Sequence, residues 1–238
     1  MSTQSPSNNQ APINNQASNQ AALHQSAGGR THSPAGEQED WTRPEQSRGW
    51  RVVDIVVAAV LGVAVGLVFF AFNNTLANFW GPLDAVLPGL AGLIAGTWFL
   101  GGPLGGLIIR KPGAALLVEL LAALVSVVPG NKWGITTLYS GLAQGLGAEL
   151  VFALFAYRRW NLGVAALAGV GAALGAFINE YILGNHAMSA TFNIIYLVCL
   201  MISGAILAGA LAWLVTRMLA ATGALNRFAS GREARTEV

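Results

Sequence analysis

The chain has 238 residues, of which 54% are hydrophobic and only 10% are charged, and its mean hydropathy is +0.53. Soluble domains carry about 25% charged residues, so this composition excludes an ordinary soluble protein. The single cysteine excludes an internal disulfide framework and a cysteine-based zinc site. Three histidines leave little material for another kind of metal site, and the net charge of +2 favours no class of partner by itself.

The first 50 residues differ in composition from the rest of the chain. Residues 1–40 are rich in Ser, Asn, Gln, Ala, Gly and Pro and almost lack large apolar side chains. Such a segment buries too little apolar surface to offset the entropy lost on ordering. We therefore predict that residues 1–50 form a disordered, polar cytosolic tail. This tail lacks the apolar core of a secretory signal peptide.

Apolar segments dominate the chain from Val52 onward. A transmembrane helix needs about 20 predominantly apolar residues. We therefore predict an all-α integral membrane protein with a six-helix membrane domain over 51–219 and a cytosolic C-terminal tail over 220–238. The predicted transmembrane helices cover residues 52–72, 83–100, 112–129, 135–157, 162–183 and 192–219. The glycine-rich stretch 101–111 is too short to span the membrane, and we interpret it as a connector or a half-helix.

Basic residues are distributed very unevenly between the two sides of the predicted membrane domain. Lys132 lies on one side, and the other 12 of the 13 Lys and Arg residues lie on the side that holds both termini. Cytosolic loops carry such an excess of basic residues, so we predict that both termini are cytosolic. Six tryptophans then fall near the interfaces, as in an aromatic belt: Trp50, Trp98, Trp160 and Trp213 inside, and Trp80 and Trp133 outside.

Known catalytic motifs are absent from the sequence. It contains no G-x-S-x-G, no H-E-x-x-H and no G-x-x-x-x-G-K-[ST] motif. We therefore predict that the chain is not an enzyme and needs no cofactor. If it takes part in ATP-driven transport, another subunit must supply the ATPase.

Polar side chains inside apolar helices are costly and point to function. Most of those found here fall in the outer half of the predicted helices, at helical spacing. This pattern predicts a pocket open to the outside for a small polar aromatic ligand. Aromatic side chains would stack on the ligand, and a carboxylate would attract a ligand that carries positive charge. The predicted ligand-binding residues are Trp80, Glu119, Trp133, Tyr139, Ser140, Gln144, Asn179, Glu180, Asn193 and Tyr196.

Not every polar residue in a membrane helix binds a ligand. Asn, Gln and Ser side chains often bond only a neighbouring helix, and this alternative stays open for each of them. Glu119 is the strongest functional candidate, because it lies midway along a predicted span and no Lys or Arg within the spans is placed to pair with it. Glu149 lies too deep for a shallow pocket, so a helix-to-helix bond is favoured for it.

Small residues recur at four-residue spacing on the first predicted span, at Ala58, Gly62 and Gly66. Such a stripe lets two helix backbones approach closely. The partner helix could belong to another subunit or to this chain, and the sequence leaves both readings open.

Two runs of sequence resemble one known family. The run PLGGLIIRKPGAALLVELLAALVSVVPGNKWG over 103–134 and the run YSGLAQGLGAELVFALFAYRRW over 139–160 are similar to the YkoE family, whose members are substrate-binding (S) components of bacterial energy-coupling factor (ECF) transporters. The resemblance covers roughly residues 50–219. It implies a multi-pass protein of the bacterial cytoplasmic membrane that captures thiamine or its hydroxymethylpyrimidine precursor from outside the cell.

The resemblance also implies partners. S components of this type work with a transmembrane coupling subunit and two cytosolic ATPase subunits, and small residues on the first helix contact the coupling subunit. Ala58, Gly62 and Gly66 match that pattern. Family members have also been labelled cobalt permease components, but only His186 lies outside the tail, so we predict no metal cargo. We expect no nucleic-acid partner.

Two other classes of membrane protein fit the sequence less well. A self-contained secondary carrier for a small polar aromatic solute would normally show paired halves with broken helices. No convincing internal repeat is present. A structural scaffold would not need carboxylates and amides gathered at the outer ends of its helices. Both alternatives are therefore less favoured than a solute-binding transport subunit.

Overall fold

The computed structural model describes residues 49–226, 228 and 230–231, and the predicted disorder of residues 1–48 lies outside them. The described residues form helices and turns, with no strand among them. The helices are α2 (Val52–Asn74), α3 (Trp80–Val86), α4 (Gly92–Ala95), α5 (Gly101–Ile109), α6 (Ala114–Val127), α7 (Thr136–Leu154), α8 (Leu162–Leu183), α9 (Ala190–Ser203) and α10 (Leu211–Ala221). Short 3-10 turns cover Leu76–Phe79, Gly96–Phe99 and Asn185–Ala187, and a π-helical segment, Gly204–Ala210, joins α9 to α10.

Four helical segments of the described chain are long and apolar enough to cross a membrane. They are Val52–Val86, Gly92–Ile109, Leu162–Leu183 and Ala190–Ala221, and Ala114–Val127 is a shorter apolar helix. The all-helical class is therefore confirmed for the described residues, and these segments have the length and hydropathy of membrane spans. The count of six spans and the orientation of the chain stay predictions.

The second predicted span, over 83–100, is wrong. The apolar helical segment begins at Gly92 and continues to Ile109, so the glycine-rich stretch is its second half rather than a connector. Every residue of α5 is buried. A side chain at Gly106 would meet the Phe152 ring at 2.3 Å, so the glycines allow α5 to pack inside the protein. The helix ends at Arg110, whose φ of 57° places it in the left-handed region.

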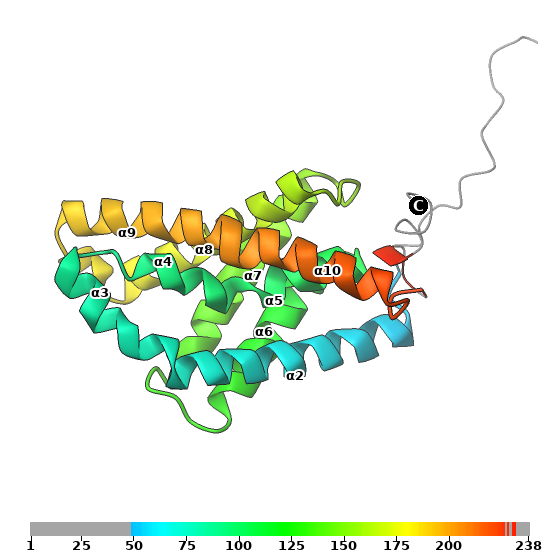
Figure 1. Cartoon of the computed structure of the whole chain (residues 1–238), viewed down its shortest axis with the longest axis horizontal. Coiled ribbons are helices and arrows are strands. Elements are labelled where there is room, and N and C mark those ends of the chain that lie inside the picture. The colour runs from blue at the N-terminus through cyan, green and yellow to red at the C-terminus, as the bar shows by residue number, and fades with distance from the viewer. Residues whose placement is uncertain (1–48, 227, 229, 232–238) are drawn as a thin grey trace, which may run out of the picture. The chain divides into compact units, whose positions relative to one another are not determined.

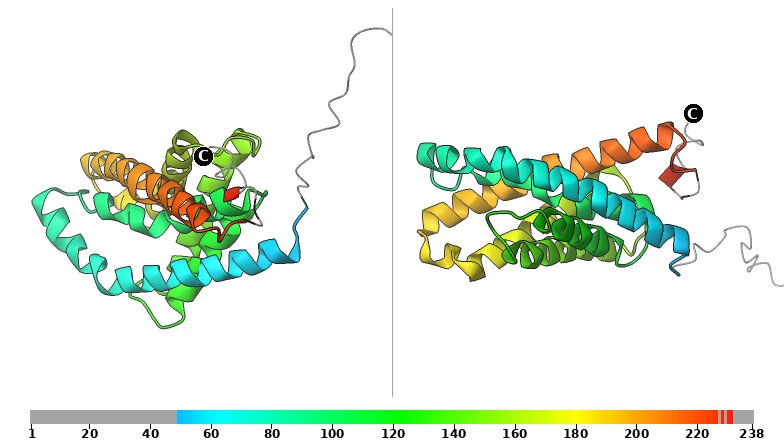
Figure 2. Two further views of the ribbon diagram at one scale, coloured as in Figure 1. Left: turned by 45° about the vertical axis from the view of Figure 1, so that its right-hand side comes forward. Right: turned by 90° about the horizontal axis from the view of Figure 1, so that it is seen from below.

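The long helices pack through small residues. Figures 1 and 2 show α2 and the continuous α9–α10 segment as the longest helices, and α2 packs on α6 while α7 packs on α8. The contact between α8 and the π-helical segment is especially close, because a Cβ atom at Gly169 would lie 2.0 Å from the Gly204 carbonyl oxygen. Such contacts bring backbones together where a larger residue would hold them apart.

The stripe of small residues on α2 faces α6. Ala58, Gly62 and Gly66 are all buried in this chain alone. A Cβ atom at Gly62 would lie 2.5 Å from Leu121 Cβ, and one at Gly66 would lie 2.5 Å from Val125 Cβ. The structure thus supports the internal-packing reading, and contact of this stripe with a coupling subunit stays a prediction.

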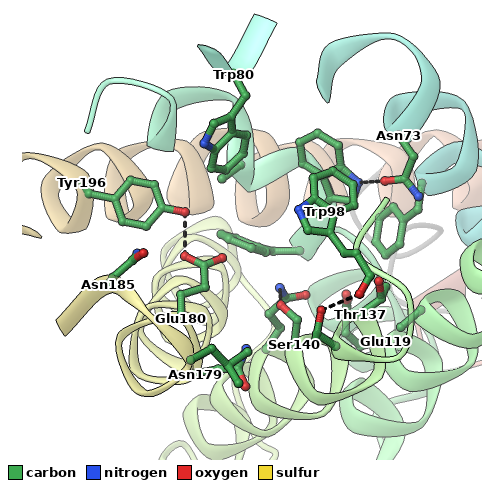
Figure 3. A pocket seen from close by; sticks show the side chains of 18 of the residues that line it. Asn73, Trp80, Trp98, Glu119, Thr137, Ser140, Asn179, Glu180, Asn185 and Tyr196 are labelled. Carbon is green, nitrogen blue, oxygen red and sulfur yellow. Dashed lines mark hydrogen bonds between the residues drawn. The ribbon is translucent and has the colours of Figure 1, made fainter. Parts of the chain in front are cut away.

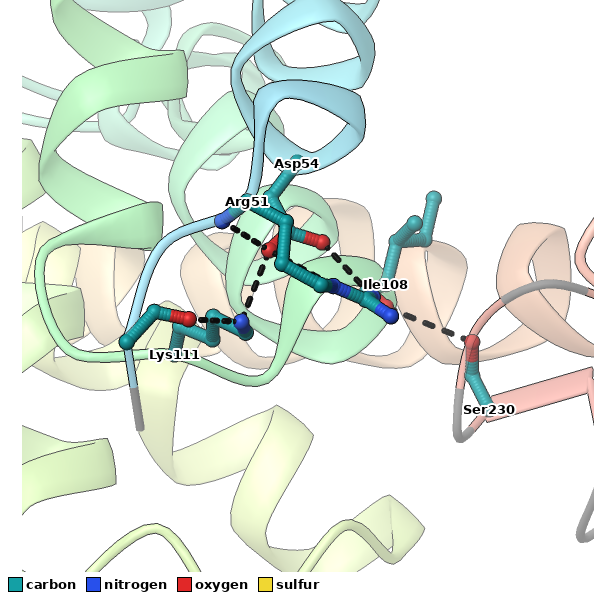
Figure 4. Close-up of polar contacts among 6 residues, drawn as sticks. Arg51, Asp54, Ile108, Lys111 and Ser230 are labelled. Carbon is teal, nitrogen blue, oxygen red and sulfur yellow. Dashed lines mark hydrogen bonds and ion pairs between the residues drawn. The ribbon is translucent and has the colours of Figure 1, made fainter. Parts of the chain in front are cut away.

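A buried ion pair ties the start of α2 to the end of α5. Asp54 is fully buried, and its carboxylate lies 2.7 Å from Lys111 Nζ and 2.9 Å from an Arg51 guanidinium nitrogen (Figure 4). The Lys111 ammonium group also donates to the Gly49 carbonyl oxygen. Close by, the Ser230 hydroxyl donates to the Ile108 carbonyl oxygen at 3.3 Å. These contacts join three separate parts of the chain at one end of the protein.

Replacing Asp54 by Asn should destabilise the protein by about 3–5 kcal/mol, because it leaves the buried Lys111 ammonium group without its counter-charge. The Lys111 side chain is only 9% exposed, whereas the Arg51 side chain is 53% exposed. Arg51→Gln is therefore the matched control, with an expected loss of about 0–1 kcal/mol. Thermal unfolding in detergent measures both variants, and equal losses would contradict the importance of the buried pair.

Candidate functional site

A cavity of about 270 Å³ lies where the C-terminal ends of α2 and α8 meet the N-terminal ends of α7 and α9 (Figure 3). Glu119 and Ala123 of α6 and the segment between α4 and α5 complete its wall. Residues far apart in the sequence therefore converge on one space. The sequence-based expectation of a single polar and aromatic pocket at one end of the helices agrees with this arrangement.

Eight of the ten predicted ligand-binding residues line the cavity: Trp80, Glu119, Trp133, Ser140, Gln144, Asn179, Glu180 and Tyr196. Tyr139 does not line the cavity, because its side chain lies on the exposed side of α7 and is 55% exposed. Asn193 is also outside the lining, and its amide donates to the Asn185 carbonyl oxygen at 2.9 Å. Asn193 therefore holds the turn before α9, and these two residues are corrections to the predicted set.

Aromatic rings form much of the cavity wall. The Trp98 ring lies at the centre of a chain, with ring centroids 6.4 Å from Trp80 and 6.0 Å from Trp133. Trp80 in turn lies 6.2 Å from Tyr196. All of these pairs meet edge to face, and ring faces in such clusters offer stacking surfaces to a flat ligand. The wall can therefore bind an aromatic ring.

Trp98 is the main correction to the predicted aromatic belt. The sequence placed it at the inner interface, but it belongs to the cavity because the second apolar helix begins nine residues later than predicted. Its indole N–H donates to Asn73 Oδ1 at 2.8 Å, and Asn73 also lines the cavity (Figure 3). The Asn73 Nδ2 group is buried and has no hydrogen-bond partner in the described structure. It is a donor that a ligand can satisfy.

One carboxylate in the cavity is held by a tyrosine. The Tyr196 hydroxyl of α9 donates to Glu180 Oε2 of α8 at 2.6 Å (Figure 3). This bond is short, and it holds the carboxyl group in one orientation. The second carboxylate oxygen, Oε1, has no hydrogen bond to the described protein. Glu180 therefore retains an acceptor for a ligand.

The other carboxylate, Glu119, is satisfied by the protein itself. The Gly102 N–H at the start of α5 donates to Glu119 Oε2 at 2.7 Å. When the Gln144 amide is oriented so that all its neighbours are satisfied, its nitrogen donates to Glu119 Oε1 at 3.2 Å and to the Trp98 carbonyl oxygen at 3.1 Å, and its oxygen accepts from Ser140. Glu119 is 1% exposed. The N-terminus of α5 therefore compensates Glu119 within the protein, and a contact between Glu119 and a ligand stays a prediction.

Glu149 forms the predicted helix-to-helix bond. Its carboxylate accepts from the backbone N–H groups of Gly113 at 2.6 Å and Ala115 at 2.9 Å, and from the Tyr157 hydroxyl at 2.7 Å. The carboxylate thus caps the N-terminus of α6, whose first N–H groups have no partner within the helix. This contact lies away from the cavity.

Several lining residues were missing from the predicted set. Asn73, Thr136 and Asn185 lie at helix ends or in short turns, and Phe69 and Phe192 read as ordinary apolar residues. The only sequence signal was their position beside predicted outer loops. Which of them reach the cavity depends on how the helices cross, and one sequence does not contain that information.

Long apolar helices around an aromatic cavity are typical of membrane proteins that bind a small molecule between their helices. The chain matches over residues 53–175 a family described as the permease component of an ABC-type cobalt transport system. It is 40% identical over 190 residues to the "Putative HMP/thiamine permease protein YkoE" of Bacillus subtilis (strain 168), a match that covers 78% of this chain and 92% of the relative. It is also similar to a solved S-component of an ECF transporter, with a TM-score of 0.73 and 37% identity over 79% of this chain and 95% of that chain.

The chain therefore belongs to the YkoE family of ECF-transporter S-components. Its relatives are transport proteins, in agreement with the prediction that it is not an enzyme. The family named in the sequence-based resemblance is thereby confirmed.

Proposed function

We propose that this protein captures thiamine or its hydroxymethylpyrimidine precursor from outside the cell, as the S-component of an ECF-type importer. The observation that carries the proposal is the aromatic cavity in which Glu180, held by Tyr196, keeps one free carboxylate oxygen. The name of the Bacillus relative supports the same class of ligand.

The chemistry of the ligand fits the cavity wall. Thiamine joins a cationic thiazolium ring to an aminopyrimidine ring, and hydroxymethylpyrimidine is a neutral molecule with the pyrimidine ring alone. Indole faces of Trp80, Trp98 and Trp133 suit both rings. Glu180 suits the positive charge, and the unpartnered Asn73 Nδ2 suits an acceptor nitrogen of the pyrimidine. A cavity of about 270 Å³ is at the small end for ligand sites and matches a compact ligand.

A metal cargo has less support. The family description names cobalt, but no group of three or more His, Cys, Asp or Glu residues among those described could hold a metal ion. The cavity instead offers ring faces and amides, which are groups that recognise an organic molecule.

The distribution of basic residues supports capture of the ligand from outside the cell. The cavity lies at the same end as Lys132, whereas the basic residues around Arg51, Lys111 and Arg159 lie at the ends of helices remote from it. By the positive-inside rule this distribution supports our proposal that the cavity opens on the outer side of a bacterial cytoplasmic membrane, in a protein with six spans and both termini inside. We also propose the partners implied by the family, namely a transmembrane coupling subunit and two cytosolic ATPase subunits.

Cysteine labelling of intact cells should report this orientation. Cys199 is the single cysteine and is buried, so a Cys199→Ala background is available. In that background a cysteine at Ala187, in the exposed turn before α9, should react with an impermeant thiol reagent on intact cells. A cysteine at the exposed Arg159 should react only after permeabilisation. The opposite pattern would contradict the proposed topology.

The proposed ligand can be tested directly on purified protein. Protein purified from cells that contain thiamine should carry thiamine or the pyrimidine, detected by mass spectrometry of the released small molecules. Titration calorimetry with each compound should then show saturable binding. Failure of both compounds to bind a folded sample would overturn the proposal.

A further inference from the structure

The charged groups in the cavity wall are all acidic. Among the described residues that line the cavity, Glu119 and Glu180 carry carboxylates, and none is a lysine, arginine or histidine. The ion pairs found within residues 49–226 involve Asp54 at the other end of the protein. The two cavity carboxylates are therefore held by hydrogen bonds from Gly102 and Tyr196 rather than by basic side chains.

The C-terminal end of α8 adds to this negative potential. Glu180 and Leu183 lie in the last turn of α8, whose terminal carbonyl groups carry partial negative charge. The N-terminal turns of α7 and α9 also reach the wall, and an N–H group in each of them has a partner within the protein. Thr137 N–H donates to the Gly134 carbonyl oxygen at 3.2 Å, and Phe192 N–H donates to Ser189 Oγ at 3.1 Å.

Lys132 precedes the lining residue Trp133 in the chain, and its ammonium group already has contacts within the protein. Lys132 is not part of the cavity lining, and its Nζ lies 4.5 Å from the centroid of the Trp133 ring. The same atom donates to the Ala77 carbonyl oxygen at 3.3 Å. This cation therefore joins the loop before α7 to the turn after α2, on the outer side of the Trp133 ring.

We infer that the cavity accepts the free alcohol forms of its ligand and rejects their phosphate esters, an inference that rests on the proposed function. A phosphate ester carries about −1.5 to −2 charges at pH 7. In the cavity it would lose hydrating water, meet the Glu180 carboxyl group and find no basic side chain to pair with. Specificity of this kind depends on repulsion of the wrong ligand as much as on attraction of the right one. Glu180 is then a specificity-determining residue as well as a contact for the thiazolium ring.

Paired titrations of the full-length protein test this inference. The pairs are hydroxymethylpyrimidine with its phosphate monoester, and thiamine with thiamine monophosphate. Each ester should bind at least about 100-fold more weakly than its parent alcohol, because a like-charge contact in a desolvated site costs two or more decades of affinity. Equal binding of alcohol and ester would overturn the inference and leave the proposed function intact. If neither member of either pair binds, the proposed function fails and the inference fails with it.

Two variants identify the groups responsible. Glu180→Gln keeps a hydrogen-bond acceptor for Tyr196 but removes the charge. It should therefore reduce the ratio of alcohol affinity to ester affinity by about tenfold or more. Lys132→Gln is the matched control at the rim and should leave the ratio of the two affinities unchanged. Tight ester binding that is lost in Lys132→Gln would show a phosphate site at the rim and would overturn the inference.

Discussion

Glu180→Gln should weaken thiamine binding by roughly 10- to 100-fold, because a hydrogen bond to a charged group contributes about 1.5–3 kcal/mol. The Gln side chain keeps the shape of Glu and still accepts the Tyr196 hydroxyl, which donates to Glu180 at 2.6 Å. Only the negative charge facing the cavity is lost. Neutral hydroxymethylpyrimidine should therefore lose much less affinity than cationic thiamine. Titration calorimetry with both ligands on the folded variant measures the difference.

Glu119→Gln is the matched control, since Glu119 is the other carboxylate of the cavity. Its oxygens accept from Gly102 N–H and from the Gln144 amide, so the carboxyl group is already bound by the protein. The substitution should lower stability and change the affinities of the two ligands by similar factors. A loss confined to thiamine in Glu119→Gln, with none in Glu180→Gln, would return the charge-pairing role to Glu119.

Gly66→Leu should destabilise the protein by about 3 kcal/mol or more, at the upper end of the range for overpacked cores. A Cβ atom at Gly66 would lie 2.5 Å from Val125 Cβ and 2.8 Å from the Ala122 carbonyl oxygen. The backbone atom cannot move away without shifting α6, which carries Glu119 and Ala123 of the cavity. Ligand binding should therefore fall together with thermal stability. Gly62→Leu should act in the same way through Leu121.

Val63→Leu on the exposed side of α2 is the control, because Val63 is 49% exposed and faces away from α6. It should leave both the melting temperature and the ligand affinity close to those of the unaltered protein. If Gly66→Leu instead kept its stability and binding but no longer co-purified with a coupling subunit, the stripe would be a partner contact after all. That outcome would reject the internal packing seen in the structure as the reason for these glycines.

Helices that coincide with a long, uninterrupted apolar segment could be predicted from the sequence alone. The predicted span over 162–183 has the bounds of α8, and the last span, over 192–219, lies within the helical segment Ala190–Ala221. A membrane helix must satisfy its own backbone hydrogen bonds and cover them with apolar side chains, so length and hydropathy define it locally. The same reasoning gave the wrong bounds for the second span. The glycines of 101–111 look like the end of a helix when the packing partner of α5 is unknown.

For the site, too, some features could be predicted from the sequence and others depend on the tertiary structure. Composition, charge bias and the cost of polar groups in a membrane were enough to indicate a membrane protein with an aromatic, acidic pocket near one end of its helices. The sequence could not decide which carboxylate stays available to a ligand. Glu119 lies opposite the N-terminus of α5 and is neutralised there, whereas Glu180 meets a single hydroxyl from α9. Those partners lie 17 and 16 residues away along the chain, and helix crossing alone brings them within hydrogen-bond distance.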